Sequence, residues 1–506
     1  MKVSIIKVSA NSEFKKYKKS MGGPPQNIFS VAAATPQGID IELIDETVDM
    51  RINFKTDADL VAIFMSTPDA VKAYTVADKF RKRGKTVVMG GLHPSALPDE
   101  ALMHCDAVLI GEQEGIWEEL LADFQIKQLK KKYERQEPVD LALLNPYPNH
   151  LIDKRRYEGV WSVVVSRGCR FKCAYCTVHR FFNTISYRPV EHIVDEIKEC
   201  SAQWIELHAD NLIADREYAI KLFEAIKPLG IQWIAECTIT IAEDKELLKL
   251  AAESGLTHLL VGLETPSKEA LKAVGKGFLG PEKVKSYIET IHQYGIHVDS
   301  SFIFGFDQHT TDIFQETLDF ARKIDLDEAH AVIMIPFPGT RLFSELETEN
   351  RLLTRDWSLY DGINAVFEPK DMTTRELEKG SNWFHKNFRP PKKKRTPVTS
   401  VKKNLSNNKN PSLPSTGLLF ERVKNYPWRS VFGLVLLVIS IVMNWAWAFG
   451  IFFLIWAAID IRTKQTYIFG PIRRDDHAVL YWATVGLWVA LALYYFGGLA
   501  KSVISF

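Results

Sequence analysis

The feature that most constrains this chain is a group of three cysteines at the end of a predicted strand. Residues 160–166 are an apolar, mostly β-branched run, and Gly168 then leads into Cys169, Cys173 and Cys176, a CxxxCxxC spacing. Thiolate is the ligand that iron–sulfur clusters use, and a loop this short covers only one face of a cluster. One iron is then left without a protein ligand, so the site is open to a further molecule.

A closed zinc site is the alternative that this spacing allows, because His179 follows Cys176 by three residues and would complete a Cys3His set. However, Tyr175 lies directly before the third cysteine, and the pattern CxxxCxYC resembles the signature of the radical S-adenosylmethionine (SAM) superfamily. The resemblance implies that the three cysteines hold a catalytic 4Fe-4S cluster. It also implies that SAM binds the open iron and that Tyr175 lies near the adenine.

Length, charge and cysteine usage limit the class of protein. The 506 residues suffice for two or three domains, and the formal net charge of +1 argues against a nucleic-acid-binding protein. Six cysteines, three of them in one loop, make a poor disulfide framework. The first residues lack the apolar run of a signal peptide, so we expect the catalytic part in the cytoplasm. We interpret Cys105, Cys200 and Cys237 as small buried side chains.

Residues 1–125 predict a doubly wound, parallel α/β domain. Short apolar runs at 2–10, 39–45, 59–65, 86–91 and 106–112 alternate with stretches of helical periodicity. In such sheets ligands bind beyond the carboxyl ends of the strands, where glycine lets the backbone approach a large ligand. The residues at those ends, each of which could also belong to an ordinary turn, are Ser66, Thr67, Gly90, Gly91, His93, Gly111 and Glu112.

This domain resembles the Rossmann-like cobalamin-binding domain that precedes the barrel in cobalamin-dependent radical SAM enzymes. The resemblance rests on GGPPQNIFSVAAATPQGIDIELIDE, DLVAIFM, GGLHPSALPDEAL and DAVLIGEQEG. The chain lacks the DxHxxG motif whose histidine ligates cobalt in other cobalamin enzymes, and His93 in GGLHPS does not match it. The resemblance therefore implies cobalamin with its own base displaced and no histidine ligand, and it leaves the lower axial position unassigned.

The prolines and charges of residues 126–159 predict a linker. Residues 160–345 then contain six strand-and-helix repeats, which predict a partial (β/α)6 barrel of the TIM type with its site at the carboxyl ends of the strands. Polar residues at those ends could bind a cofactor or could cap helices. They are Asp210, Asn211, Glu236, Glu264, Ser300 and Ser301.

Among these we favour Asp210, Glu264 and Ser301 as cofactor-binding residues. The sequence VGLET around Glu264 resembles a strand whose acidic residue contacts the SAM ribose in relatives. Residues 346–388 look like the C-terminal extension of the same catalytic core.

The last part of the chain predicts membrane association. Residues 389–430 contain eleven Lys or Arg and one acidic residue, Glu421, which indicates a disordered basic linker. Residues 431–459 and 478–500 lack charges and are 29 and 23 residues long, and each exceeds the roughly 20 residues that cross a bilayer. We therefore expect transmembrane helices within 431–500 and a multi-pass protein of the inner (cytoplasmic) membrane.

Together these features predict a membrane-anchored enzyme that cleaves SAM reductively and modifies an unactivated carbon. The resemblance implies C-methylation or a carbon-skeleton rearrangement, and the membrane segments suggest a lipid or isoprenoid substrate. A small electron donor such as ferredoxin or flavodoxin is implied, and no nucleic acid. The alternatives are an oxidative cyclase that transfers no methyl group and a cobalamin or redox sensor without turnover.

Overall fold

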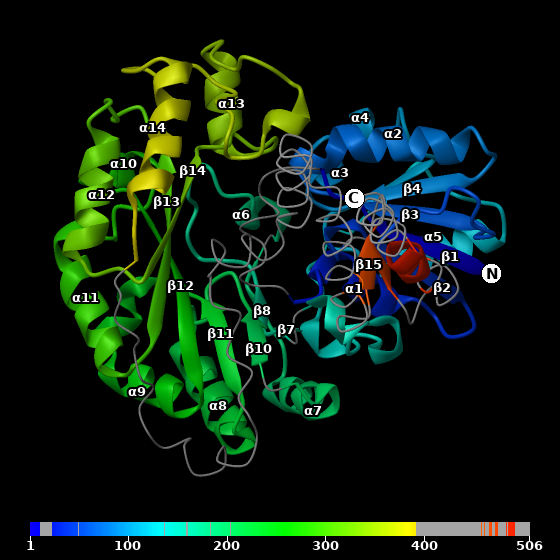
Figure 1. Cartoon of the computed structure of the whole chain (residues 1–506), viewed down its shortest axis with the longest axis horizontal. Helices are drawn as coiled ribbons and strands as arrows, with labels where there is room; N and C mark the ends of the chain where they lie inside the picture. Colours follow the sequence, from blue (N-terminus) through cyan, green and yellow to red (C-terminus); the bar gives the residue numbers. More distant parts are fainter. Residues whose placement is uncertain are drawn as a thin grey trace, which may run out of the picture. The chain divides into compact units, whose positions relative to one another are not determined.

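The computed structural model describes residues 1–10 and 23–390, apart from 49, 136, 158–159, 183 and 203, and a few short pieces between 457 and 490. The chain divides into two compact units, Met1–Asn410 and Pro411–Phe506. The first contains two six-stranded parallel sheets (Figure 1). In the second, the described residues include an antiparallel pair, β15 (Gln465–Tyr467) and β16 (Pro471–Arg473).

The first sheet has the strand order β2-β1-β3-β4-β5-β6, and all its pairings are parallel. Its strands are β1 (Lys2–Lys7), β2 (Asp40–Asp45), β3 (Leu60–Phe64), β4 (Thr86–Gly90), β5 (Ala107–Ile110) and β6 (Lys132–Glu134). Its helices are α1 (Gln26–Ala34), α2 (Ala70–Arg81), α3 (Leu92–Ala96), α4 (Pro98–Ala101) and α5 (Ile116–Gln125). The strand order reverses between β1 and β3, and ligands of doubly wound sheets bind at such a switch point.

The edge strand β6 lies inside the segment that the sequence assigned to a linker. Only Tyr133 of its three residues is buried, between the exposed Lys132 and Glu134. An edge strand this short gives no alternation of apolar residues, so the sequence pattern could not reveal it.

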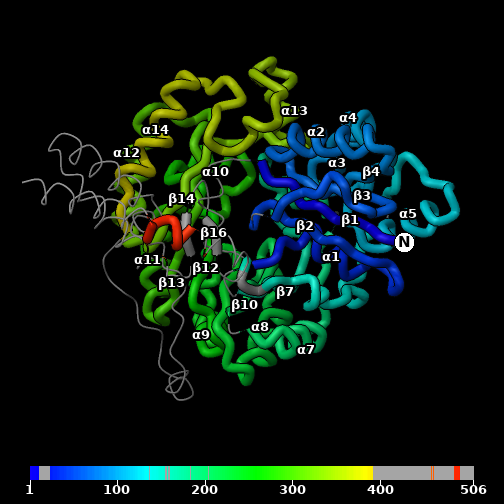
Figure 2. Tube along the Cα trace, turned by 45° about the vertical axis from the view of Figure 1, so that its right-hand side comes forward, coloured from blue at the N-terminus to red at the C-terminus, as the bar shows by residue number. Residues whose placement is uncertain are grey.

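The second sheet follows the chain order β7-β10-β11-β12-β13-β14 and has β7 and β14 as its edges. The two edge strands do not pair, so the barrel is open, which agrees with the partial barrel expected from six repeats. Its strands are β7 (Val160–Val164), β10 (Trp204–His208), β11 (Gln232–Glu236), β12 (Leu256–Glu264), β13 (His297–Phe304) and β14 (Glu328–Ile333). Its helices, on the outside in Figures 1 and 2, are α7 (Val190–Cys200), α8 (Arg216–Ile226), α9 (Lys245–Glu253), α10 (Lys268–Ala273), α11 (Pro281–Gln293) and α12 (Ile313–Lys323).

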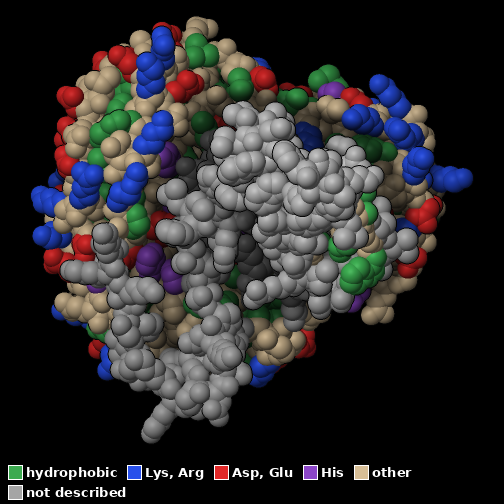
Figure 3. All heavy atoms as spheres, in the orientation of Figure 1, with side chains coloured by type: hydrophobic (Ala, Val, Ile, Leu, Met, Phe, Trp, Pro, Cys, Tyr) green, Lys and Arg blue, Asp and Glu red, His purple; other side chains and the backbone are tan. Residues whose placement is uncertain are grey.

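The two faces of the barrel strands differ in burial. On β13, Val298, Ser300 and Phe302 face the helices and are completely buried, whereas the alternating His297 and Asp299 are partly exposed. A closed barrel fills its interior with packed side chains, but here the inward-facing side chains line an open lumen. None of the six strands contains a lysine or arginine, so the lumen is polar and acidic. On the outer helices, by contrast, both charges are interspersed (Figure 3).

The C-terminal extension of this unit packs against the last barrel strands. It contains α13 (Arg341–Thr348) and α14 (Thr374–Asn387), and α14 begins with a capping box between Thr373 and Glu376. The ring of Phe384 on α14 lies 5.9 Å from that of Phe302 and 5.6 Å from that of Phe304. This aromatic contact covers the outer face of β13.

Among the residues that the structure describes, no helix is long and apolar enough to span a membrane. The predicted membrane segments 431–459 and 478–500 lie almost wholly outside those residues, as does most of the basic segment 389–430.

Candidate active site and cofactor sites

The three cysteines follow a tight turn that places their loop at the carboxyl end of the barrel. The short strand β8 (Ser166–Arg167) continues from β7, and Gly168 then adopts a φ of +89°. A Cβ at this position would lie 2.2 Å from the carbonyl oxygen of Thr184, so only glycine fits. The Gly168 N–H donates a 2.7 Å hydrogen bond to Asp210 Oδ2 at the end of β10. Asp210 thereby fixes the start of the cysteine loop.

One cavity of about 260 Å³ gathers the site residues predicted in the barrel; we call it the cluster pocket. All seven predicted residues line it, and they are Cys169, Cys173, Cys176, Tyr175, Asp210, Glu264 and Ser301. They come from the ends of four different strands, so the fold assembles in space what is separated by up to 132 positions in the chain. Of the other three candidates, Asn211 and Glu236 also line the pocket, whereas Ser300 points towards the helices and is fully buried.

The three thiols suit an iron–sulfur cluster better than zinc. In a tetrahedral zinc site with metal–sulfur bonds of about 2.3 Å, sulfurs lie about 3.8 Å apart. Within the described part of the chain, only Asp299, Glu328 and His330 bring three ligand atoms within 4.8 Å of one another, so the cysteines and His179 form no such group. Burial raises the pKa of each of the three thiols, that of Cys176 to about 11. Bound metal is therefore needed to hold them as thiolates.

Glu264 is held at the end of β12 by a lysine that the sequence did not reveal. Its backbone has a φ of +62°, and its carboxylate accepts a 2.5 Å hydrogen bond from Lys276 Nζ. The same ammonium donates to the carbonyl of Gly262 at 2.8 Å. The hydroxyl of Tyr175 also donates to Glu264, and burial together with that carboxylate raises the pKa of Tyr175. Lys276 lies in the loop between α10 and α11. No motif or strand end in the sequence around it predicts a binding residue.

Two further polar groups of this pocket could contact SAM. Asn211 lines the pocket, and its buried Nδ2 finds no hydrogen-bond partner among the residues that the structure describes, so this donor could serve a ligand. Glu236, at the end of β11, faces the same space, and its side chain is accessible there. Desolvation by the neighbouring protein raises its pKa to about 7, against the opposing effect of the nearby His208. The donors and acceptors present therefore fit a polar cosubstrate bound beside the cluster.

The first sheet carries a second cavity at the carboxyl ends of its strands, the strand-end pocket of about 150 Å³. Ser66 and Thr67, which follow β3, line it together with Ala96 of α3. Arg180, which follows the cysteine loop, lines it as well. A Cβ at Gly111, where φ is +82°, would meet no described residue within 4 Å, which leaves the backbone there accessible to a large ligand. These residues fit a bulky cofactor such as cobalamin.

Three of the residues predicted to bind cobalamin contact other protein groups and do not line the strand-end pocket. His93 is completely buried, with its ring nitrogens 3.3 Å from Thr67 Oγ1 and from Glu100 Oε1, so its imidazole does not line the strand-end pocket. Glu112 accepts a 2.8 Å hydrogen bond from Arg167. Gly91 has a φ of +107°, and a Cβ added there would lie 2.5 Å from the carbonyl oxygen of Met65.

The neighbouring Gly90 is equally enclosed, since a Cβ there would lie 2.6 Å from the ring of Phe64. Both glycines therefore serve the packing of β4 against β3, and a bulky residue at either would disturb the sheet before it reached a cofactor.

Filling the strand-end pocket directly is the sharper test of cobalamin binding. We expect Ala96→Phe to lower the corrinoid absorbance per mole of purified protein several-fold, because the new ring would occupy the cavity. Ala122→Phe, which adds the same ring to an exposed position of α5, serves as the control and should keep its corrinoid. An Ala96→Phe protein with full corrinoid content would contradict this assignment.

A single short helix separates the two pockets. Cys176 and Val178 line the cluster pocket, whereas Thr177 and Arg180 line the strand-end pocket. All four belong to the segment that ends in α6 (Val178–Phe181). Cys176 and the cavity beside the first sheet are thus within one helical turn of each other.

Comparisons with known proteins agree with this arrangement. Residues 163–321 match the model of the radical SAM superfamily, and residues 21–121 match that of the B12-binding domain. The chain is 28% identical over 365 residues to bacteriochlorophyllide d C-12(1)-methyltransferase of Chlorobaculum tepidum, covering 70% of this chain and 80% of the relative. It is 30% identical over 417 residues to the uncharacterized methyltransferase PH0819 of Pyrococcus horikoshii, covering 75% of this chain and 90% of the relative.

A solved structure shows the same fold at low sequence identity. The radical SAM methyltransferase TsrM of Kitasatospora setae, with cobalamin and a 4Fe-4S cluster bound, superposes with a TM-score of 0.56 at 14% identity, covering 69% of this chain and 75% of TsrM. The sensor alternative is not supported, because the relatives are enzymes. The chain is a radical SAM enzyme that uses a 4Fe-4S cluster, SAM and cobalamin, and it belongs to the cobalamin-dependent radical SAM methyltransferase family.

Proposed function

We propose that this enzyme transfers a methyl group to an unactivated carbon of a lipid or isoprenoid. The observation that carries the proposal is the arrangement around α6. Cys176 lines the cluster pocket, and Arg180, four residues later, lines the adjacent strand-end pocket. When bound, the cluster and SAM supply radical chemistry and cobalamin supplies a methyl group. A methyl donor and a radical source on the two sides of one helical turn could act on the same substrate carbon.

The protein's own part in this reaction is to position the reactants and to exclude water. Asp210 holds the start of the cysteine loop, and Lys276 holds Glu264 towards the cluster pocket. Tyr175 packs edge-on against Phe306, with ring centroids 6.4 Å apart, which holds the tyrosine ring in place at the pocket. These residues are assigned to SAM binding, and the polar lumen below them to the substrate.

The substrate class is inferred from the sequence of the C-terminal part. Two long uncharged segments after a basic linker favour an enzyme anchored in the inner membrane, with its catalytic unit in the cytoplasm. A bilayer-soluble substrate is the simplest reason for such an anchor. The acidic and histidine-rich lumen further favours a substrate that carries a polar group beside its apolar part. Electrons would come from a small carrier such as ferredoxin or flavodoxin.

The proposal is tested with protein whose cluster is reconstituted without oxygen. Dithionite and SAM labelled in its methyl group are added together with lipid extracted from the source cells. We expect 5′-deoxyadenosine to form and the label to enter one lipid fraction. 5′-Deoxyadenosine that depends on the lipid but leaves it unlabelled would favour the cyclase alternative instead.

Removing residues 396–506 separates catalysis from access to the substrate. We expect the shortened protein to cleave SAM as the full chain does, because the described residues of both pockets lie before residue 340. Its methyl transfer to substrate in membrane vesicles should fall by at least tenfold, whereas transfer to detergent-dispersed substrate should be retained. Equal rates on vesicles for both proteins would remove the reason for invoking the membrane.

A further inference from the structure

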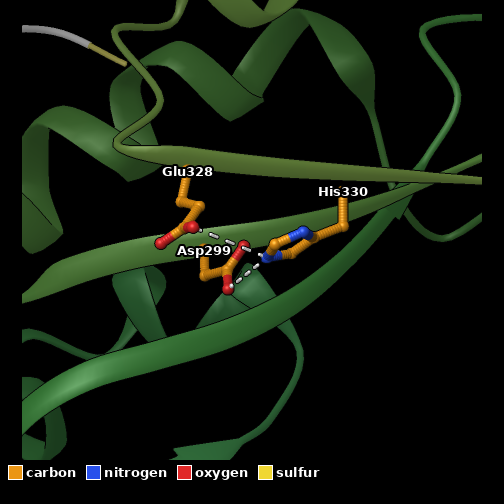
Figure 4. A group of neighbouring side chains, drawn as sticks. All are labelled: Asp299, Glu328 and His330. Carbon is orange, nitrogen blue, oxygen red and sulfur yellow. Dashed lines mark hydrogen bonds and ion pairs between the residues drawn. The ribbon is translucent and has the colours of Figure 1, made fainter. Parts of the chain in front are cut away.

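The lumen of the barrel contains a second group of potential metal ligands, apart from the cysteines. Asp299 on β13 and Glu328 and His330 on β14 bring one ligand atom each within 4.8 Å of one another (Figure 4). His330 Nε2 lies 3.1 Å from Asp299 Oδ2 and 3.9 Å from Glu328 Oε1. Ligand atoms that share a metal ion at bonds of about 2.1 Å lie about 3.0–3.5 Å apart. The group is therefore close to the spacing that a metal needs.

The sheet holds these three side chains on one face. Asp299 pairs in register with Glu328, and Ser301 pairs with His330, so all four residues point into the lumen from two adjacent strands. Ser301 also lines the cluster pocket, and Asp299 is two residues before it on the same face. The group thus lies one layer below the space assigned to SAM.

One oxygen atom of this group has no protein partner among the described residues. Asp299 Oδ2 faces His330, but the other carboxylate oxygen, Oδ1, is buried and accepts no hydrogen bond from the part of the chain that the structure describes. A buried carboxylate oxygen is normally satisfied by a donor or a cation. The simple interpretation as a histidine–aspartate ion pair leaves this atom unexplained.

The charge of the lumen also favours a cation. Besides Asp299 and Glu328, the carboxylates of Glu206 and Glu236 face it, and none of the six strands supplies a lysine or arginine. Lys276, which lines the cluster pocket, is paired with Glu264. Glu328 Oε2 additionally lies 4.0 Å from His297 Nε2, so a further imidazole is at hand.

We propose that Asp299, Glu328 and His330 bind a divalent metal ion of the manganese, iron or zinc type in the lumen. Mixed imidazole and carboxylate ligands suit these ions. Three protein ligands leave coordination positions open towards the lumen, as in catalytic metal sites. An oxygen atom of the substrate could bind there, which would orient the substrate below the SAM site. The metal site itself does not depend on the proposed methyl transfer.

The test is a Mn2+ titration of the full-length protein, with its oxidised cluster and cobalamin bound, followed by the EPR signal of free Mn2+. We expect one ion to bind per chain and Zn2+ to displace it. The near-isosteric Asp299→Asn and Glu328→Gln variants and the His330→Gln variant should each weaken binding at least tenfold. Cluster absorbance and the melting temperature check that each variant is folded.

The matched control is His104→Gln, which breaks a histidine–aspartate pair with Asp78 at 3.0 Å on the first domain. It should bind Mn2+ like the wild type. The proposal is overturned if the wild-type protein binds neither Mn2+ nor Zn2+ in the lumen. It is equally overturned if all three lumen variants bind as tightly as the wild type. Since no turnover is measured, either result leaves the proposed function untouched.

Discussion

Alanine at Cys169, Cys173 or Cys176 is expected to abolish the formation of 5′-deoxyadenosine from SAM. Each thiol lines the cluster pocket, and each is raised in pKa by burial, so none is a thiolate without its metal. Losing one of three ligands leaves a second iron without a protein ligand, and the cluster should be lost or degraded. Iron and sulfide content and the visible absorbance after anaerobic reconstitution give the structural readout beside SAM cleavage.

The control for these variants is Cys200→Ala, at a fully buried cysteine of α7 outside the cluster pocket. It should keep its iron and its activity, apart from the modest loss of stability that a smaller core side chain causes. A variant of the cysteine loop that still cleaves SAM would contradict the cluster assignment. Stoichiometric zinc in place of iron in the wild-type protein would contradict it as well.

Arg167→Met is expected to destabilise the catalytic unit by about 3–5 kcal/mol, because it leaves two buried carboxylates without their partner. The Arg167 guanidinium is 6% exposed and lies 2.8 Å from Glu112 and 2.7 Å from Glu114. Although burial opposes it, this guanidinium holds the pKa of Glu114 below its usual range. The contact joins the loop after β5 of the first sheet to the residue before Gly168, where the cysteine loop begins.

The melting temperature measures this loss, and two further variants make the result specific. Combining Arg167→Met with Glu112→Gln and Glu114→Gln should recover most of the stability, since no unpaired charge then remains. Arg216→Met, which removes a solvent-exposed pair with Asp244, should lower the melting temperature far less, because water screens an exposed ion pair. If Arg167→Met melts like Arg216→Met, the buried contact does not hold the two sheets together.

The same substitution has an expected effect on catalysis. Because Arg167 links the strand ends of the first sheet to the cysteine loop, its loss should lower the yield of transferred methyl groups per 5′-deoxyadenosine formed. A proportional fall of both products would indicate a general loss of folded protein instead.

The residues of the cluster pocket were predictable because the chemistry marks them locally. CxxxCxYC is a contiguous pattern, and polar residues such as Asp210, Glu264 and Ser301 stand directly at the ends of apolar runs. Parallel strands bring their carboxyl ends to one rim, so residues far apart in the chain share one pocket. Lys276 escaped prediction because it comes from a loop, and a loop position becomes meaningful only once the strand that it contacts is placed.

The first domain was predictable in topology but not in the direction of its side chains. His93 follows a strand end as a ligand-binding residue would, yet it packs between Thr67 and Glu100 and near the ring of Trp357 from the C-terminal extension. Glu112 turns to Arg167. Glu100 is only seven residues from His93, but Thr67 is 26 residues away and Arg167 is 55 residues from Glu112, so no local pattern could reveal these contacts.

The sequence by itself determined the two parallel α/β folds and the family to which the chain belongs, and it predicted the three sulfur ligands. These depend on periodicity and on short motifs, which are local properties of a chain. Only the tertiary structure decided that α6 separates two cavities, that Arg167 joins the sheets, and that Asp299, Glu328 and His330 meet in the lumen. Such contacts depend on strand order and register, which set the neighbours of a side chain through pairing between distant segments.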